Sequence, residues 1–220
     1  MPMNEKVAFF DFCETLVDFQ TADAYVDFVR ERTNNRRMVL LNNIQSLLTR
    51  IKVIKVLSVI FPTKSVNKRI KLFQLKGFSE EELKELASYY YLERIKPHFI
   101  QRLVETLIEL KNDGYSVGLV SGGYGIYLQY FVEEYNLDFC VSSNISFRKG
   151  KCTGLLDGLD CLNNNKIILL KQYFKETPQD SIAFSDSVSD IPLLQYAKKG
   201  VVVSRQHQEW SNIFYNEIIW

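Results

Sequence analysis

Four short segments of the chain carry side chains that could together transfer a phosphoryl group. Phosphoryl transfer requires a nucleophile, a cation that neutralises phosphate oxygens, and hydrogen-bond donors around those oxygens, because its transition state is stabilised mainly by electrostatics. Residues that can fill these roles occur at 11–15, 121–123, 166 and 184–190. The sequence therefore predicts a phosphoryl-transfer site built from these segments.

Asp11 is the candidate nucleophile of this site. One of its carboxylate oxygens can attack phosphorus while the other holds a hard cation, and Asp186 can complete the oxygen shell that Mg²⁺ requires. Taken alone, Asp11 could be no more than a strand-end acid. Asp186 and Asp190 could likewise be acids that cap a helix, with serines beside them. The order of the four segments along the chain favours the functional interpretation.

The segment Ser121 to Gly123 is the candidate phosphate-binding loop. Backbone N–H groups at Gly122 and Gly123, ahead of a helical stretch, can bind phosphate oxygens beside the Ser121 hydroxyl. The alternative is an ordinary strand-to-helix turn, since glycine serves conformational freedom as often as close approach of a ligand. Both interpretations stay open from the sequence alone.

Lys166, at the start of a predicted helix, supplies the positive charge that a phosphate site needs. The alternative is that Lys166 is an exposed helical lysine, in which case Lys171 or Lys151 would contact phosphate. His98 and His207 stand in no recognisable relation to the acids. Structural roles are therefore expected for both histidines.

The elements that must position these residues alternate between short apolar runs and helical periodicity after residue 97. Such alternation predicts a parallel sheet with helices on both faces and ligands at the carboxyl ends of its strands. The expected strands are 7–12, 115–120, 139–141, 182–184 and 200–203, and the expected helices are 99–110, 125–135, 166–174 and 191–197. Residues 145–156 suit a small hairpin or excursion.

Between the first two strands the pattern is helical throughout. Thr21 is expected to cap the first helix of this region, and a second helical stretch covers 38–61, interrupted before Pro62. Ser79 with Glu82 forms a capping box that opens a further helix. This part of the chain is therefore predicted to contain no strand.

The fold expected from these patterns is an α/β fold with a Rossmann-like, doubly wound parallel sheet. The chain has 220 residues, of which 46% are hydrophobic, enough to bury one sizeable core. Residues 1–16 and 92–220 are predicted to form the core domain, and residues 17–91 a helical cap domain inserted after the first strand.

Cysteine usage and the N-terminal sequence favour a cytoplasmic location. No secretory signal is recognised at the start, and no run is long enough to span a bilayer, so stable membrane insertion is not expected. The four cysteines lack CxxC spacing, which indicates reduced thiols and argues against zinc. They are Cys13, Cys140, Cys152 and Cys161.

Basic residues are concentrated in the predicted cap. Between Arg30 and Lys76 there are twelve lysines and arginines against one acid, Glu31. A solvated helix face is the simpler interpretation of this run. The alternative is an electropositive surface that attracts anionic substrates or lipid headgroups. Nucleic acid is not expected as a partner, and the sequence leaves the oligomeric state open.

With these motifs in place, the chain resembles the haloacid dehalogenase superfamily, in the branch similar to phosphoserine phosphatases. The resemblance covers nearly the whole chain and includes the segments 75–83, 149–154 and 185–194. It implies Asp11 as phosphoryl acceptor and phosphate binding by Ser121 and Lys166. It further implies a Mg²⁺ cofactor, with ligands and positioning groups as follows: ligation by Asp11, Asp186 and the carbonyl of Cys13, and positioning by Thr15 and Asp190.

Cys13 departs from the pattern of this family, whose phosphatases usually have a second acid two residues after the nucleophile. That acid protonates the leaving group and later activates water, and such help accelerates reactions about 10²- to 10⁴-fold. A free thiol titrates near pH 8.5 and is a poor substitute. Glu14 is not expected to replace it, because adjacent residues leaving a strand point in different directions.

The function expected from the sequence is hydrolysis of a small phosphorylated metabolite through an aspartyl-phosphate on Asp11. Because of Cys13, hydrolysis is expected to be slow or restricted to good leaving groups. Two alternatives stay open: a catalytically weak phosphate-binding or regulatory protein, and a phosphotransferase or lipid-phosphate phosphatase. Catalysis by the Cys13 thiol is the weaker interpretation, since no histidine is placed to activate it.

Overall fold

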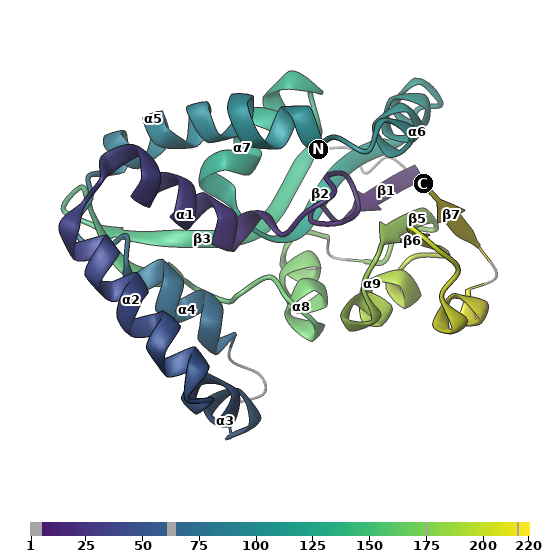
Figure 1. The fold of residues 1–220 in the computed structure, drawn as a ribbon. Helices are drawn as coiled ribbons and strands as arrows, with labels where there is room; N and C mark the ends of the chain where they lie inside the picture. The colour runs from purple at the N-terminus through teal and green to yellow at the C-terminus, as the bar shows by residue number, and fades with distance from the viewer. Residues whose placement is uncertain (1–5, 61–64, 175, 215) are drawn as a thin grey trace.

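A seven-stranded sheet forms the centre of the computed structural model, which describes residues 6–60, 65–174, 176–214 and 216–220. Its strand order is β4-β3-β2-β1-β5-β6-β7 (Figure 1). The strands are β1 (Lys6–Phe10), β2 (Ser116–Tyr124), β3 (Phe139–Arg148), β4 (Lys151–Asp157), β5 (Asp180–Ser185), β6 (Lys199–Ser204) and β7 (Glu217–Ile219). All neighbours are parallel except β3 and β4, which form an antiparallel pair.

The central strand β1 is buried on both faces, as a parallel strand must be when helices cover both sides of its sheet. Ala8 and Phe10 belong to one hydrophobic cluster, and Val7 and Phe9 belong to the other. Helices α6 (Gln101–Asn112) and α7 (Gly125–Glu134) contribute side chains to the first cluster, and α8 (Asn164–Tyr173) and α9 (Ile191–Tyr196) to the second. The expected doubly wound α/β fold is confirmed.

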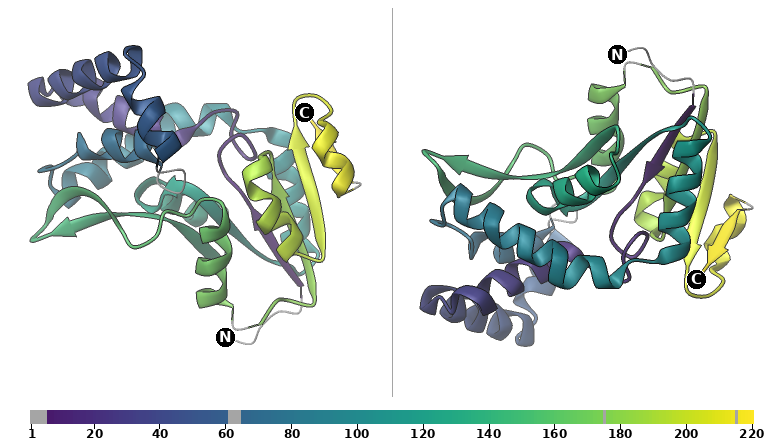
Figure 2. Two further views of the ribbon diagram at one scale, coloured as in Figure 1. Left: turned by 90° about the horizontal axis from the view of Figure 1, so that it is seen from below. Right: turned by 90° about the horizontal axis from the view of Figure 1, so that it is seen from above.

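Helices occupy the chain between β1 and β2. They are α1 (Thr21–Thr33), α2 (Arg36–Arg50), α3 (Val53–Ile60), α4 (Val66–Phe73) and α5 (Glu80–Tyr90), followed by a π-helical turn (Tyr91–Ile95) and a 3₁₀ turn (Lys96–His98). Within the described part of this region, strand pairing is limited to isolated bridges. Figure 2 shows these helices lying to one side of the sheet, with α2 and α3 farthest from the central strands.

The two ends of this helical insertion are joined to each other. The N–H of Ile100 donates to the carbonyl of Leu16 at 2.9 Å, and the N–H of Asp18 donates to the carbonyl of His98 at 3.2 Å. Val17 and Phe99 form an antiparallel bridge between these contacts. The chain therefore leaves the core and returns to it at one place.

Local details of the insertion differ from the sequence prediction in two places. Thr21 is the first helical residue of α1 and not its cap; Gln20 is the cap, and the Thr21 hydroxyl is used in contacts described below. The stretch 38–61 is divided into α2 and α3 where Lys52 has a φ of 61°. The predicted interruption before Pro62 lies outside the described residues.

The predicted capping box and hairpin are confirmed. Ser79 caps α5 by accepting a hydrogen bond from the N–H of Glu82 at 3.2 Å. The hairpin expected at 145–156 is the β3–β4 pair. The cysteines are all free thiols. No helix in the described parts of the chain is long and apolar enough to cross a membrane.

Candidate active site

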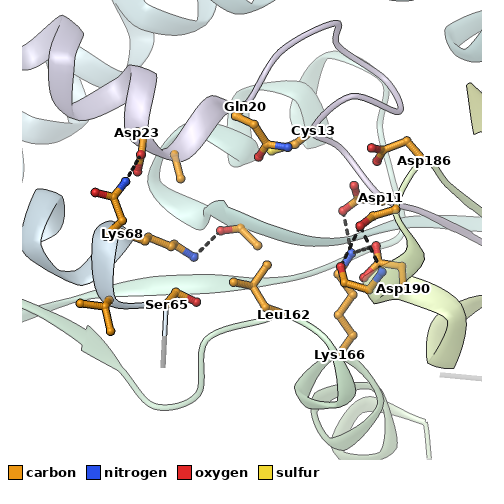
Figure 3. A pocket seen from close by; sticks show the side chains of 16 residues that line it. Asp11, Cys13, Gln20, Asp23, Ser65, Lys68, Leu162, Lys166, Asp186 and Asp190 are labelled. Atoms are coloured by element: carbon orange, nitrogen blue, oxygen red, sulfur yellow. Dashed lines mark hydrogen bonds and ion pairs between the residues drawn. The ribbon is translucent and has the colours of Figure 1, made fainter. Parts of the chain in front are cut away.

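A cavity of about 440 Å³ lies beyond the carboxyl ends of β1 and β5, between the sheet and helices α1 and α4. Figure 3 shows Asp11, Lys166, Asp186 and Asp190 at one end of the cavity and Asp23 and Lys68 at the other. The cavity is lined by Asp11, Cys13, Gln20, Ala22, Asp23, Ser65, Val66, Asn67, Lys68, Gly122, Leu162, Lys166, Asp186, Ser187, Ser189 and Asp190.

Lys166 joins two acids at this end of the cavity. Its Nζ donates to Oδ1 of Asp11 at 2.7 Å and forms a second ion pair with Asp190. Ser185 donates to the carboxylate of Asp190 at 2.7 Å. The Asp11 backbone is held to the neighbouring strand, because its N–H donates to the carbonyl of Phe184 at 2.9 Å. The structure thus brings together three of the predicted site residues.

Burial and neighbouring charges both shift the pKa values of Asp11 and Lys166. Burial raises the pKa of Asp11 to about 6; Lys166 opposes the rise and Asp190 adds to it. Burial alone would lower the pKa of Lys166, but the charges of Asp11 and Asp190 together hold it above its ordinary value. Lys166 therefore stays positively charged beside Asp11, where an incoming phosphate would need it.

Asp186 and Thr15 are hydrogen-bonded to each other beside Asp11. The Thr15 hydroxyl donates to Oδ1 of Asp186 at 3.2 Å and accepts from the Asp186 N–H at 3.1 Å. Burial, followed by the negative charges of Asp11 and Glu14, raises the pKa of Asp186 to about 7. Two carboxylates that repel in this way are a donor set that a divalent cation would stabilise.

The residues present fit a small, hard cation. Asp11 and Asp186 offer carboxylate oxygens, and the main-chain carbonyl of Cys13 is the third predicted oxygen donor; oxygen ligands are those that Mg²⁺ prefers. The described residues contain no group of three or more His, Cys, Asp or Glu side chains arranged around a metal position. A Mg²⁺ ion here would be held by the carboxylates of Asp11 and Asp186 and by the carbonyl of Cys13.

The glycine loop occupies the last part of β2, where the pairing with β3 is irregular between Ser121 and Tyr124. Ser121 is fully buried, and its Oγ accepts from the N–H of Gly123 at 3.1 Å. Gly122 lines the cavity. A Cβ at Gly122 would lie 2.3 Å from Cδ2 of Leu162, so close packing is one reason for glycine there. The predicted strand end at residue 120 was therefore too early.

Cys13 lines the cavity, but its thiol faces helix α1. Its Sγ lies 3.0 Å from Oγ1 of Thr21, which is itself 2.7 Å from the hydroxyl of Tyr127. Burial, followed by the charge of Asp11, raises the pKa of the Cys13 thiol to about 11. A thiol of this kind stays protonated and donates protons poorly at neutral pH.

Glu14 does not take the place of a second acid in this cavity. It adopts a φ of 55°, accepts a hydrogen bond from the side-chain amide of Gln20, and lines a separate depression with Asp186 and Arg205. This placement agrees with the expectation that adjacent residues leaving β1 diverge. The alternative phosphate-binding lysines, Lys171 and Lys151, are exposed and do not line the cavity.

Each histidine has an acidic partner that the sequence did not reveal. Nδ1 of His98 lies 2.9 Å from Asp18, and Nδ1 of His207 lies 2.6 Å from Glu217. Both imidazoles are exposed, and neither lines the cavity. These contacts fit the structural roles expected for both histidines.

Sequence reasoning missed Lys68, a buried residue of α4 at the far end of the cavity. Its Nζ donates to the carbonyl of Gly122 at 2.6 Å and to Oγ of Ser143 at 3.1 Å, and it forms an ion pair with Asp160. No motif marks Lys68, because it lies within a basic run that reads as a solvated face. Nor does the sequence place Asp160, which lies in the segment after β4 and accepts a hydrogen bond from Ser143 of β3.

The sequence of this chain is similar to those of proteins with known family membership. A family model described as haloacid dehalogenase-like hydrolase matches residues 8–195. The phosphoserine phosphatase of Methanocaldococcus jannaschii is 29% identical over 206 residues, which cover 90% of this chain and 84% of that protein. The phosphoserine phosphatase of Lactococcus lactis subsp. lactis is 31% identical over 102 residues, covering 45% of this chain and 46% of that protein.

Solved structures share the fold. A protein of unknown function from Bordetella pertussis Tohama I superimposes with a TM-score of 0.80 at 18% identity, covering 98% of this chain and 99% of that one. A phosphoserine phosphatase in its apo form has a TM-score of 0.63 at 21% identity, covering 98% and 94% of the two chains. At these identities the likeness concerns the arrangement of strands and helices.

Proposed function

This chain belongs to the haloacid dehalogenase-like hydrolase family, and on that premise we propose that it is a Mg²⁺-dependent phosphatase with Asp11 as its nucleophile. The observation that carries the proposal is the contact of Asp11 with Lys166, beside Asp186 and Asp190, at the end of a cavity of about 440 Å³. The curated relatives reported above are named phosphoserine phosphatases, which supports a phosphomonoester as substrate.

The proposed reaction has two steps. In the first, a carboxylate oxygen of Asp11 attacks phosphorus, the bond to the ester oxygen breaks, and the leaving oxygen takes a proton from water. In the second, water attacks the aspartyl-phosphate, which releases inorganic phosphate and restores Asp11. Lys166 and the N–H groups near Gly122 bind the phosphate oxygens. Mg²⁺, held by Asp11, Asp186 and the carbonyl of Cys13, would supply further neutralisation of phosphate charge.

Two residues position these groups. Asp190 forms the second ion pair of the Lys166 ammonium. Thr15 donates to the carboxylate of Asp186 and accepts from its backbone N–H, which orients this residue. Neither needs to touch the substrate. Because all of these groups are largely buried, the geometry is fixed before the substrate binds.

Residues 17–91 are proposed to act as a cap that selects the substrate and excludes water. Helices α1 and α4 contribute the part of the cavity lining that lies away from Asp11, including Ala22, Asp23 and Asn67. A small phosphorylated metabolite fits the volume. The free thiols suit a reducing compartment such as the cytoplasm, which is the location we propose.

The nucleophile can be tested by replacing Asp11 with asparagine. We expect Asp11→Asn to lower Mg²⁺-dependent hydrolysis of p-nitrophenyl phosphate by at least about 10³-fold, since the amide cannot form the intermediate. Asp113→Asn, at the end of α6, is the matched control and should leave the rate unchanged. Mass spectrometry of quenched wild-type protein should find a phosphoryl group on the peptide that contains Asp11. Retention of most activity by Asp11→Asn would refute the assignment.

A second candidate function is favoured by one observation, the thiol of Cys13 in the position expected for an acid. A chain that binds phosphate but turns it over poorly would serve as a sensor or regulator. It would retain phosphate binding with Mg²⁺ while showing no measurable release of p-nitrophenol. Transfer of the phosphoryl group to an acceptor other than water would instead appear as phosphorylated acceptor in the presence of added alcohols.

A further inference from the structure

Helix α2 presents an apolar stripe to solvent. Leu40, Ile44 and Leu47 are spaced four and three residues apart, which places them on one face of α2, and Ile51, the C-cap of this helix, continues the spacing four residues later. Their exposed fractions are 60%, 46%, 58% and 58%. Scattered surface leucines need no explanation, but a continuous exposed stripe indicates a surface that binds something.

The other face of α2 is already packed against the protein. Met38 is fully buried, and Gln45 is 5% exposed and bonded on both sides. Its Nε2 donates to Asn67 at 2.8 Å, and its Oε1 accepts from Gln74 at 2.8 Å. Rotation of α2 to bury the stripe would break these contacts. The stripe is therefore the outward face of a helix whose inward face is satisfied.

Helix α3 extends the apolar surface. Val53 and Val56 are exposed, at 36% and 57%, on the helix that follows directly. Figures 1 and 2 show α2 and α3 at the outer end of the insertion, away from the sheet. The apolar surface is thus carried by the most projecting part of the described molecule.

Basic side chains surround this apolar surface. Arg36, Arg50, Lys52 and Lys55 are exposed and make no ion pair with an acid in the described parts of the chain. On a helical projection of α2, Arg36 and Arg50 flank one side of the stripe and Arg37 flanks the other. No aspartate or glutamate occurs from residue 32 to residue 79. The surface is therefore both apolar and positively charged.

We propose that α2 and α3 dock onto an anionic lipid bilayer, with the apolar stripe in the interface and the basic side chains at the headgroups. An apolar face between flanking arginines and lysines is the pattern by which helices lie on membranes. A second copy of this chain is disfavoured as occupant, because it would bring the same positive charges into contact. The membrane is bound and not crossed.

The position of the pocket suits this docking. Helix α4 begins shortly after α3 and lines the cavity with Val66, Asn67 and Lys68. The docking surface and part of the cavity wall thus belong to consecutive helices of the insertion. Binding to the bilayer would hold the cavity near its surface, although the docking proposal stands without any assumption about the substrate.

The test is co-sedimentation of the full chain with sucrose-loaded vesicles. Vesicles of phosphatidylcholine with about 30% phosphatidylglycerol should bind the protein, and phosphatidylcholine alone should bind it at least about tenfold more weakly. Binding should fall as salt rises from about 0.05 to about 0.5 M, because the shorter Debye length screens the basic residues.

Three variants separate the contributions of the surface. The double change Leu40→Asn and Leu47→Asn should weaken partitioning by at least about tenfold, since it removes apolar area from the interface. Arg36→Gln with Arg50→Gln should weaken it and reduce its dependence on salt. The matched control, Leu92→Asn with Leu155→Asn, changes two leucines with 56% and 59% exposure elsewhere and should bind like wild type.

Thermal melts and p-nitrophenyl phosphate hydrolysis establish that each variant is folded. The proposal is overturned if wild-type protein fails to sediment with the anionic vesicles. It is equally overturned if the Leu40 and Leu47 variant binds as well as wild type. A wild-type dimer that dissociates in this variant, without vesicle binding, would instead identify the stripe as a contact between copies.

Discussion

The thiol of Cys13, which stands where an acid is expected, should slow the hydrolysis of substrates whose leaving group needs a proton. Its thiol is turned toward Thr21, and its pKa is raised to about 11, so it cannot protonate a leaving group efficiently near pH 7. Cleavage should then depend strongly on the leaving group. Aryl phosphates, whose leaving groups are stable as anions, should react far faster than alkyl phosphates.

We expect Cys13→Asp to raise kcat for alkyl phosphomonoesters by about 10² to 10⁴-fold, the usual contribution of a positioned acid. The gain for p-nitrophenyl phosphate should be much smaller, since p-nitrophenolate leaves without a proton. Steady-state rates on a series of leaving groups would measure this difference.

Cys13→Asn is the matched variant, because it adds a polar side chain of the same size without an acidic proton. It should leave the preference for aryl phosphates unchanged. Equal gains for Cys13→Asn and Cys13→Asp would contradict the role assigned to position 13, since only the aspartate can exchange a proton. Equal gains on aryl and alkyl phosphates would contradict it as well.

Asp11, Asp186 and Lys166 could be predicted from the sequence as site residues, but Lys68 could not. Asp11, Asp186 and Lys166 stand at strand ends or helix starts, and parallel strands bring such positions to one edge of a sheet. Lys68 is buried by contacts with Asp160 and Gly122, which are distant in sequence. Nothing in its immediate neighbours distinguishes it from the exposed lysines around it.

Between elements, the Lys68–Asp160 pair links helix α4 to the end of β2 and the segment after β4. Both side chains are largely buried, at 10% and 5% exposure, and Oδ2 of Asp160 has no hydrogen-bond partner in the described structure. Removal of the lysine would therefore leave a buried carboxylate without a counter-ion.

Lys68→Met should lower the free energy of unfolding by about 3 kcal/mol, the lower end of the range for breaking a buried ion pair. Asp160→Asn should lower it less, because Lys68 keeps the carbonyl of Gly122 and the hydroxyl of Ser143. Urea unfolding of both single variants and of the double variant would give the coupling energy. Additive losses would show that the pair does not act as a unit.

Element types could be predicted more securely than element ends. The alternation of apolar runs gave the parallel strands, but β2 extends to Tyr124 through two glycines that usually mark a turn. Close packing explains them, because a Cβ at Gly123 would lie 2.9 Å from the hydroxyl of Tyr127. Strand β7 was not predicted, since its three residues give too short a pattern.

At the scale of the whole molecule, binding of Mg²⁺ should stabilise the fold. Burial, followed by the negative charges of Asp11 and Glu14, raises the pKa of Asp186 to about 7. A cation between Asp11 and Asp186 would relieve the repulsion between these two carboxylates. At a concentration of 100 Kd, binding adds about 2.7 kcal/mol to the free energy of unfolding, which corresponds to a Tm increase of about 5 to 10 °C for a chain of this size.

Differential scanning fluorimetry with MgCl₂ would measure this increase in Tm. Asp186→Asn should abolish the increase, whereas Asp157→Asn, an exposed position at the end of β4, should retain it. An equal increase in wild type and Asp186→Asn would mean that the ion binds elsewhere.

The contact between the two ends of the insertion bears on how the insertion can change in length during evolution. Because Leu16 and Ile100 are held together at the core, the two ends of residues 17–98 stay side by side whatever the length of chain between them. The entropy of closing a flexible loop grows only logarithmically, by about 0.6 kcal/mol for each doubling. Longer or shorter insertions can be exchanged at this junction over evolutionary time, each bringing a different surface to the carboxylate of Asp11, the proposed nucleophile.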